Sequence, residues 1–131
     1  GGVYLTVRDD DKANLVPIAQ QLTELGFTLY ATSGTADVLR ANSVPVEIVY
    51  RIRETMHPDA LDLMRQGKIS FIVNVPTISG GAVRDGNMMR RLAVELNIPF
   101  VTTIRGAKME VAAIGAMMKG EMEPVRLTVN Y

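Results

Sequence analysis

The sequence predicts an α/β fold, a three-layer Rossmann-like domain with a five-stranded parallel sheet flanked by helices. Two observations predict it. Short apolar runs alternate along the chain with segments whose apolar residues recur at helical spacing, and short connections join them. The run Ile-Ser-Phe-Ile-Val at residues 69–73 is apolar almost throughout, as expected of a strand that helices cover on both faces. These residues are therefore expected to form the central strand.

The first half of the chain is expected to form two strand-helix units and a third strand. Residues 3–7 are a strand, and the helix after them starts near Asn14, because Pro17 is tolerated only in the first helical turn. This leaves Lys12 in or beside the loop. Gly26 ends the helix. A strand at 27–31, a helix from about 35 to 42 and a strand at 46–50 come next.

The second half continues the alternation. Residues 51–57 are expected to be an irregular link, and Pro58 to be the first residue of a short helix that Gly67 ends. After the strand at 69–73, the pattern predicts a glycine-containing loop at 77–84, a helix over 89–96, a strand at 99–103, a helix from about 109 to 120 and an edge strand at 125–131.

The composition describes one domain, residues 1–131, with 47% hydrophobic and 21% charged residues. Fourteen basic and fourteen acidic side chains cancel, so no net positive field attracts nucleic acid or an anionic membrane, and any anion site must be local. No apolar run is long enough to span a bilayer, and cysteine is absent, which fits a cytoplasmic setting. The start at Gly1 and Gly2 fits either a scar of cloning or a domain cut from a longer polypeptide.

Polar residues gather where the predicted strands end. In an open parallel sheet, ligands bind beyond the carboxyl ends of the strands, where helices begin and backbone N–H groups point outward. Eight residues are therefore expected at one edge of the sheet. They are Lys12 after the first strand, Thr32, Ser33, Gly34 and Thr35 after the second, Arg51 after the third, and Asn74 and Thr77 after the fourth.

The turn at residues 32–35 has the chemistry of an anion site. Gly34 allows close backbone approach, the hydroxyls donate hydrogen bonds, and a helix starting near Thr35 adds free N–H groups and a positive dipole end. Lys12 would add an ammonium group. The alternative is that Thr35 is simply an N-cap, which stabilises a helix by about 1 kcal/mol. The spacing of a Walker loop and the G-x-G-x-x-G fingerprint are both absent from the sequence.

Other chemically suggestive residues have plainer explanations. The three aspartates at residues 9–11 could hold a hard cation or supply a base, but acidic residues before a helix also complement its dipole. His57 could be a general acid, yet it lacks an obvious orienting carboxylate and is expected to be a helix-entry residue. Most of the eight methionines are expected to fill the core. Arg90 and Arg91 are expected to be solvated helix charges or interdomain ion pairs.

Four segments carry a resemblance to a known family. They are LTVRDDDK, LGFTLYATSGTADVLRANSVPVEIV, GKISFIVNVP and RDGNMMRRLAVELNIPFVTTI, in that order. Over residues 3–119 the chain resembles the methylglyoxal-synthase-like domain, and it looks most like the version at the C-terminus of the large subunit of carbamoyl phosphate synthetase. The resemblance implies a five-stranded parallel sheet with flanking helices, in agreement with the pattern above.

In that synthetase the domain is regulatory, so the resemblance implies an effector domain with neither catalytic residues nor a metal of its own. It implies binding of a nucleoside monophosphate such as UMP or IMP, and contact with the catalytic domains of the same large subunit, where ornithine also acts. Through them it implies a glutaminase small subunit, in a parent enzyme that uses ATP and Mg. The matching effector positions are Lys12, Thr32, Thr35, Arg51 and Asn74, with a further threonine contact near Pro76 or Thr77.

Other members of the family match less well. Methylglyoxal synthase eliminates phosphate from dihydroxyacetone phosphate with an aspartate base in a GGDQQ segment. That position falls on His57 here, although Asp9 and Asp85 persist. The cyclohydrolase domain of purine biosynthesis shares the Gly-Thr pair of the turn, and TMHP at residues 55–58 echoes its TLHP, but its preceding lysine is absent. A ligand-free interaction module is the remaining alternative, favoured if residues 77–84 block the edge.

Overall fold

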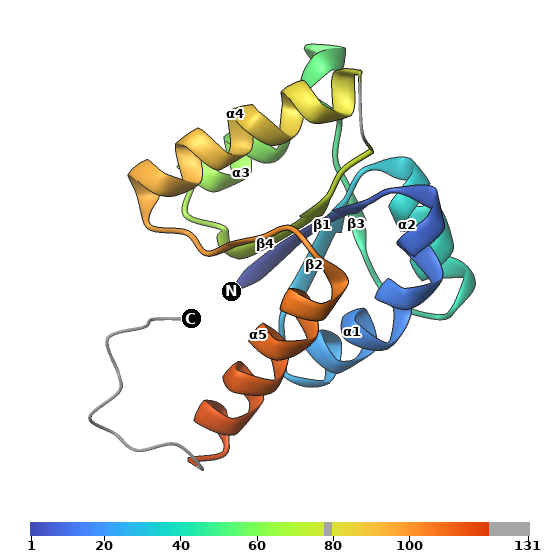
Figure 1. Ribbon diagram of the computed structural model, residues 1–131, viewed down its shortest axis with the longest axis vertical. Coiled ribbons are helices and arrows are strands. Elements are labelled where there is room, and N and C mark those ends of the chain that lie inside the picture. The colour runs from blue at the N-terminus through green and yellow to red at the C-terminus, as the bar shows by residue number, and fades with distance from the viewer. Residues whose placement is uncertain (78–79, 121–131) are drawn as a thin grey trace.

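Residues 1–77 and 80–120 are described by the computed structural model, and they confirm the predicted sheet of five parallel strands (Figure 1). The order across the sheet is β3-β2-β1-β4-β5, so the chain moves outward from β1 to β3 and then returns to the other side of β1. The strands are β1 (Gly2–Val7), β2 (Thr28–Ala31), β3 (Glu47–Ile48), β4 (Ile69–Val75) and β5 (Phe100–Val101).

The middle strand is β1, so the prediction that residues 69–73 of β4 form the central strand is wrong. β1 pairs with β2 on one side and with β4 on the other. Val3, Tyr4 and Leu5 are buried, as are Phe71 and Ile72 of β4. An apolar run shows that both faces of a strand are covered. Because β1 and β4 both meet that condition, the apolar run could not show which of the two strands lies in the middle of the sheet.

Helices cover both faces of the sheet, which gives the three predicted layers (Figure 1). On one face lie α1 (Lys12–Glu24), α2 (Ser33–Ala41) and α5 (Ile104–Met118). On the other lie α3 (Ala60–Arg65) and α4 (Gly81–Leu96). Two short 3-10 helices, η1 (Asp9–Asp11) and η2 (Ile52–Glu54), follow β1 and β3.

Alternate side chains of the inner strands enter two separate cores. Leu5 and Phe71 pack with residues of α1, α2 and α5, including Leu15. Tyr4 and Ile72 pack with residues of α3 and α4 on the opposite face. Burial of apolar surface in these two layers is the main source of stability. It also holds the strand ends, and the loops that follow them, in fixed positions.

The starts of α1 and α3 differ from the prediction by two residues each. α1 starts at Lys12, not near Asn14, because η1 runs directly into it. Pro17 lies inside α1 and is exposed. Proline has no N–H group, so α1 lacks one backbone hydrogen bond, on the side of the helix that faces solvent. α3 starts at Ala60 and not at Pro58, because Asp59 forms its N-cap. The glycine at position 67 follows the end of α3, as expected.

The other three helices start earlier than predicted, α2 at Ser33, α4 at Gly81 and α5 at Ile104, and two strands are shorter than predicted. β3 and β5 pair over two residues each, fewer than the predicted runs. α4 begins at Gly81, within the predicted loop. α5 begins at Ile104, where the Thr103 hydroxyl accepts a hydrogen bond from the Gly106 amide at 2.9 Å. The edge strand predicted at 125–131 lies outside the described residues.

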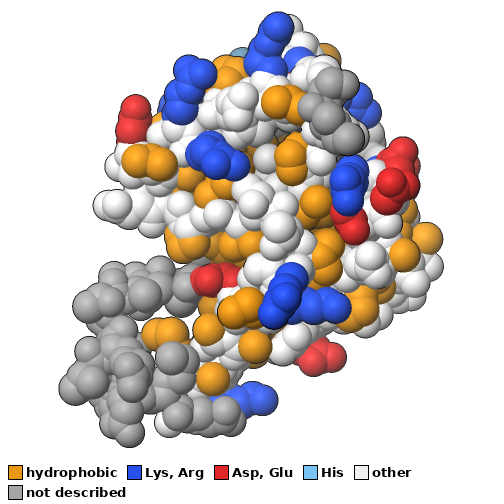
Figure 2. Space-filling model, viewed as in Figure 1, with side chains coloured by type: hydrophobic (Ala, Val, Ile, Leu, Met, Phe, Trp, Pro, Cys, Tyr) orange, Lys and Arg blue, Asp and Glu red, His pale blue; other side chains and the backbone are white. Residues whose placement is uncertain are grey.

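The surface mixes charged and apolar groups. Figure 2 shows basic, acidic and hydrophobic side chains interspersed over the viewed face, in keeping with the balanced charge of the chain. The prediction that most methionines fill the core is wrong, because methionine occurs on both the inner and outer sides of the helices. Met64 and Met89 are buried, whereas Met56, Met88, Met109 and Met118 are exposed. Among the described residues, no helix is long and apolar enough to cross a membrane.

Candidate anion-binding site

A cavity of about 200 Å³ opens beyond the carboxyl ends of β1 and β4. Its lining includes Thr6 and Val7 of β1 and Asn74 and Val75 of β4, and we call it the edge cavity. The chain leads from β1 toward β2 but from β4 toward β5, so these neighbouring strands flank the point where the connections reverse direction. Ligand sites of open α/β sheets lie at such a switch point.

The structure brings seven of the eight predicted residues to the edge cavity. They come from four separate connections and meet because all the strands end at the same edge of the sheet. Ser33, the eighth residue, is exposed and does not line the cavity. The seven are Lys12, Thr32, Gly34, Thr35, Arg51, Asn74 and Thr77.

The amino end of α2 forms one wall of the edge cavity. Thr32 is the N-cap, and the first bond of the helix runs from the Ala36 amide to the Thr32 carbonyl at 2.9 Å. The amides of residues 33–35 precede that bond and so have no acceptor within the helix. Gly34 adds no side chain in front of them. Free amides and the positive end of the helix dipole together favour an anion.

Thr35 does not cap α2, so the simpler explanation of this residue is wrong. It is the third residue of the helix and is 3% exposed. Its Oγ1 accepts a hydrogen bond from the Val7 amide at 3.4 Å. Thr32, the actual N-cap, makes no side-chain capping bond. Thr35 therefore ties the amino end of α2 to the end of β1 and fixes the wall of the cavity.

Lys12 lies against the same turn. Its Nζ is 3.6 Å from the point that a Cβ on Gly34 would occupy, and its side chain is only 16% exposed. The ammonium pairs with the carboxylate of Asp9, which is 94% exposed. The hydrogen bond from Lys12, followed by the charge of Lys12, lowers the pKa of the Asp9 carboxyl. An incoming anion can displace this exposed carboxylate and take its place beside the ammonium.

Arg53, Asp85 and Tyr4 also line the cavity and were not among the eight residues predicted for the site. Arg53 of η2 places its Nη1 2.8 Å from Oδ2 of Asp85, a buried residue of α4. Tyr4 of β1 lines the same cavity, and burial, followed by the charges of Asp85 and Asp59, raises the pKa of its hydroxyl. The hydroxyl therefore keeps its proton at neutral pH and can donate a hydrogen bond.

The aspartates at residues 9–11 form η1, and two of them hold basic side chains. Asp9 pairs with Lys12, and Oδ2 of Asp11 lies 2.7 Å from Nε of Arg8. The hydrogen bond with Asp11, and then its charge, raises the pKa of Arg8. These ion pairs occupy carboxylates that a hard cation would need. The geometry therefore favours a structural role for this acidic run.

Comparison with known proteins gives the family of the chain. A model of the MGS-like domain matches residues 14–102, which is more than half of the sequence. The chain belongs to the MGS-like domain family.

Two solved structures have a similar fold. A methylglyoxal synthase from Elizabethkingia anophelis aligns with a TM-score of 0.62 and 17% identity over 84% of this chain and 76% of that one. The protein ForH aligns with a TM-score of 0.59 and 17% identity over 92% and 82%.

Relatives with higher identity to this MGS-like domain are parts of a larger enzyme. The carbamoyl phosphate synthase large chain, C-terminal section, of Methanocaldococcus jannaschii is 50% identical over 123 residues, 93% of this chain and 20% of that protein. The same section from Methanopyrus kandleri is 45% identical over 87% of this chain and 21% of that protein. The chain thus spans about a fifth of the length of these curated relatives.

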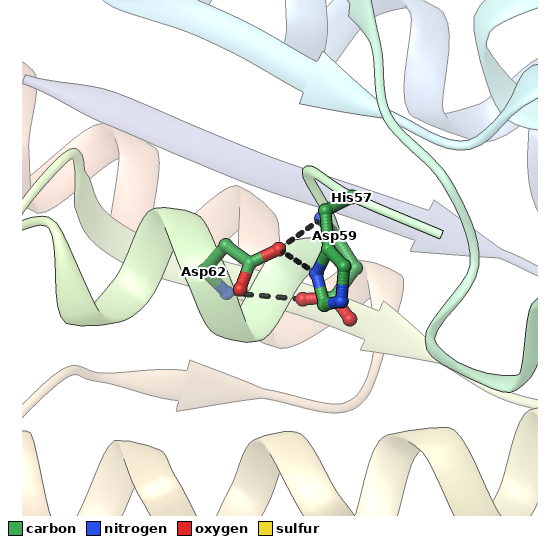
Figure 3. A group of neighbouring side chains, drawn as sticks. All are labelled: His57, Asp59 and Asp62. Carbon is green, nitrogen blue, oxygen red and sulfur yellow. Dashed lines mark hydrogen bonds and ion pairs between the residues drawn. The ribbon is translucent and has the colours of Figure 1, made fainter. Parts of the chain in front are cut away.

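His57 of this MGS-like domain, which takes the position expected for the methylglyoxal synthase base, does not line the edge cavity. The expectation that it lacks an orienting carboxylate is wrong. Its Nδ1 lies 2.6 Å from Oδ2 of Asp62, in the first turn of α3 (Figure 3). The side chain of His57 is 71% exposed. The pair lies at the surface, away from the lining residues, so its position favours a structural role.

Asp59 and Asp62 form a reciprocal cap at the start of α3. Oδ1 of Asp59 accepts from the Asp62 amide at 3.0 Å, and Oδ2 of Asp62 accepts from the Asp59 amide at 2.9 Å (Figure 3). With His57 they offer ligand atoms within 4.8 Å of one another, close enough to hold a metal ion. Both carboxylates already accept backbone hydrogen bonds. Helix capping therefore explains why these side chains lie close together.

Protonation of His57 is expected to stabilise the fold. The hydrogen bond to Asp62, and then its charge, raises the pKa of His57. When the pKa of a histidine is higher in the folded state than in the unfolded state, its protonation stabilises the fold. This stabilisation is complete at a pH below the unfolded-state pKa, about 6.5, and is lost as the pH rises through the folded-state pKa. His57→Gln should therefore lower the free energy of unfolding more at about pH 5.5 than at about pH 8.5, in urea titrations. Equal losses at both pH values would contradict the ion pair.

Proposed function

We propose that this MGS-like domain is the allosteric effector-binding domain of a carbamoyl phosphate synthase large chain. It binds a nucleoside monophosphate of the UMP or IMP type through its phosphate. The observation that carries the proposal is the edge cavity, in which Lys12, the open amino end of α2 and Arg51 line one space. Helix amino ends and cationic side chains are the groups that bind phosphate, through charge-assisted hydrogen bonds. Asn74 and Thr77 add neutral polar groups to the same lining.

The charge of the edge cavity suits a phosphate monoester. A monoester carries about −1.5 to −2 charge at pH 7. Four cationic side chains and two carboxylates line the cavity, and two of the cations, Arg8 and Arg51, pair with Asp11 and Glu54, which lie outside the lining. The cations are Arg8, Lys12, Arg51 and Arg53, and the carboxylates are Asp9 and Asp85.

The size of the edge cavity indicates how such a ligand would lie. A volume of about 200 Å³ is below the roughly 300 Å³ of the smallest pockets that enclose a drug-sized molecule. The phosphate and part of the sugar are expected inside, with the base at the mouth. The phosphate should therefore contribute more to affinity than the identity of the base does.

The relatives support a regulatory place in a larger enzyme. The two C-terminal sections of a synthase large chain described above are each about five times as long as this chain. We infer that the other domains of the large chain are its partners, and that a glutaminase subunit is reached through them. Effector binding would modulate carbamoyl phosphate synthesis by favouring one arrangement of these domains, with a coupling free energy of about 1–3 kcal/mol.

A phosphate elimination of the methylglyoxal synthase type has less support. It needs a general base within reach of the substrate. His57 is not among the lining residues, and the two lining carboxylates, Asp9 and Asp85, each hold a cation. The pair with Lys12 lowers the pKa of the Asp9 carboxyl, which makes it a weaker base. Turnover of dihydroxyacetone phosphate by the chain would support this alternative.

Isothermal titration calorimetry with UMP, IMP and the corresponding nucleosides tests the proposal. The expected result in phosphate-free buffer is saturable binding of one or both nucleotides and at least tenfold weaker binding of the nucleosides, because the phosphate contributes most of the affinity. The difference between UMP and IMP should be smaller than that. Equal affinity for nucleotide and nucleoside would contradict a phosphate site, and failure of both nucleotides to bind would contradict the proposed effector class.

A further inference from the structure

The two carboxylates that line the edge cavity are held very differently. Asp9 lies on the single turn of η1, and its side chain is 94% exposed. Asp85 lies in the second turn of α4, and its side chain is 10% exposed. Asp9 can rotate into solvent when an anion approaches Lys12. Asp85 is held in the wall of the cavity by its low exposure on α4 and by its pair with Arg53.

Arg53, the partner of Asp85, is also packed in place. A Cβ on Gly81, in the first turn of α4, would lie 2.5 Å from Cδ and 3.0 Å from Nε of Arg53. The arginine therefore lies directly on the amino end of α4, where glycine makes room for it. One turn further on, a Cβ on Gly86 would lie 2.6 Å from Nδ2 of Asn74. Close packing on both η2 and β4 thus fixes this wall of the cavity, with Asp85 in it.

We propose that Asp85 limits the negative charge that the edge cavity accepts, and so selects a phosphate monoester over a diphosphate. This inference rests on the proposed function. A monoester carries about −1.5 to −2 charge at pH 7, and a diphosphate brings roughly one further negative charge. In a cavity of about 200 Å³ that charge lies within the field of the Asp85 carboxylate. A fixed repulsive group of this kind acts against the wrong ligand and leaves the right one in place.

The test compares UMP with UDP by isothermal titration calorimetry without divalent cations. The unchanged chain should bind UMP at least tenfold more tightly than UDP. Asp85→Asn removes the charge while it keeps the shape, and should reduce this preference by about tenfold. Asp37→Asn is the matched control, because Asp37 is exposed on α2 and does not line the cavity. It should leave the ratio of the two affinities within about twofold, since solvent screens its charge.

A double variant separates the charge of Asp85 from its structural role. Asp85→Asn leaves Arg53 without its partner, so the fold of each variant is checked by circular dichroism and thermal unfolding. Arg53→Gln combined with Asp85→Asn removes both charges of this ion pair, so the net charge of the lining equals that of the unchanged chain and neither charge is left unpaired. This double variant should recover the preference of the unchanged chain for UMP.

The possible failures are distinguishable. If UMP does not bind the unchanged chain, the proposed function fails and this inference fails with it. If UMP binds but the ratio to UDP is the same in Asp85→Asn, only the selection by charge is overturned. A double variant that folds and still shows the ratio of Asp85→Asn would likewise overturn it, because charge balance would then not set the preference.

Discussion

Replacing Lys12 with alanine is expected to weaken UMP binding by tenfold or more. The Lys12 ammonium lies against the amino end of α2, and its side chain is largely shielded from solvent. A hydrogen bond between charged groups contributes about 1.5–3 kcal/mol, and 1.4 kcal/mol corresponds to a tenfold change in affinity. Removal of Lys12 also leaves the Asp9 carboxylate beside the site without its cation. Isothermal titration calorimetry of Lys12→Ala against the unchanged chain measures the loss.

Lys68→Ala is the matched control for that experiment. Lys68 is exposed, precedes β4 at the opposite end of the strand, and does not line the edge cavity. It removes the same charge from the chain, so an effect of net charge alone would appear in both variants. Lys68→Ala should change the affinity for UMP by less than about twofold. Unchanged affinity in Lys12→Ala would place the phosphate elsewhere.

Replacing Phe71 with alanine is expected to lower the free energy of unfolding by about 3–5 kcal/mol. Phe71 is fully buried in β4, and its ring meets that of Phe27 edge to face, with the centroids 6.3 Å apart and the planes at 84°. Truncation would leave a cavity between the sheet and the α1, α2 and α5 layer. Since domains are stable by only about 5–15 kcal/mol, this is a large part of the total. Urea unfolding should show a lower midpoint with an unchanged slope.

Val94→Ala is the control for the core substitution. Val94 lies on α4 and is 74% exposed, so little buried surface is lost. Alanine also has the higher helix propensity, and the free energy of unfolding should change by no more than about 0.5 kcal/mol. A loss in Phe71→Ala as small as that would show that β4 is not packed as described.

The parallel sheet was predictable because each strand is followed at short distance by a helix, which requires the next strand to run in the same direction. Strand order was not predictable in the same way, because β1 and β4 are equally apolar. Helix starts depended on which polar residue caps each helix. Several consecutive residues before α2 could serve as the cap, and the spacing did not distinguish Thr32 from Thr35.

The candidate site was predictable to the extent that it follows from the ends of strands. Lys12 and Arg51 each follow a strand and Asn74 lies near the end of β4, so the rule for parallel sheets brought them together. Arg53 and Asp85 could not be found this way, because their pairing depends on side-chain packing between positions 32 residues apart. The partner of His57 had a local signal, since Asp62 follows five residues later in the first turn of a helix. The Asp59 cap sets that turn, and no periodicity reveals it.

A titration of the ¹⁵N-labelled chain with UMP, followed by nuclear magnetic resonance, tests most directly whether the edge cavity is an effector site. The account predicts saturable shifts of the backbone amides of Ser33, Gly34 and Thr35 and of the Asn74 side-chain amide, with the α3 cap at Asp59 and Asp62 affected least. The same shifts should appear with inorganic phosphate at higher concentration, since the phosphate is the group that these amides bind. Saturable shifts confined to other parts of the chain, or none at any concentration of UMP, would contradict the account.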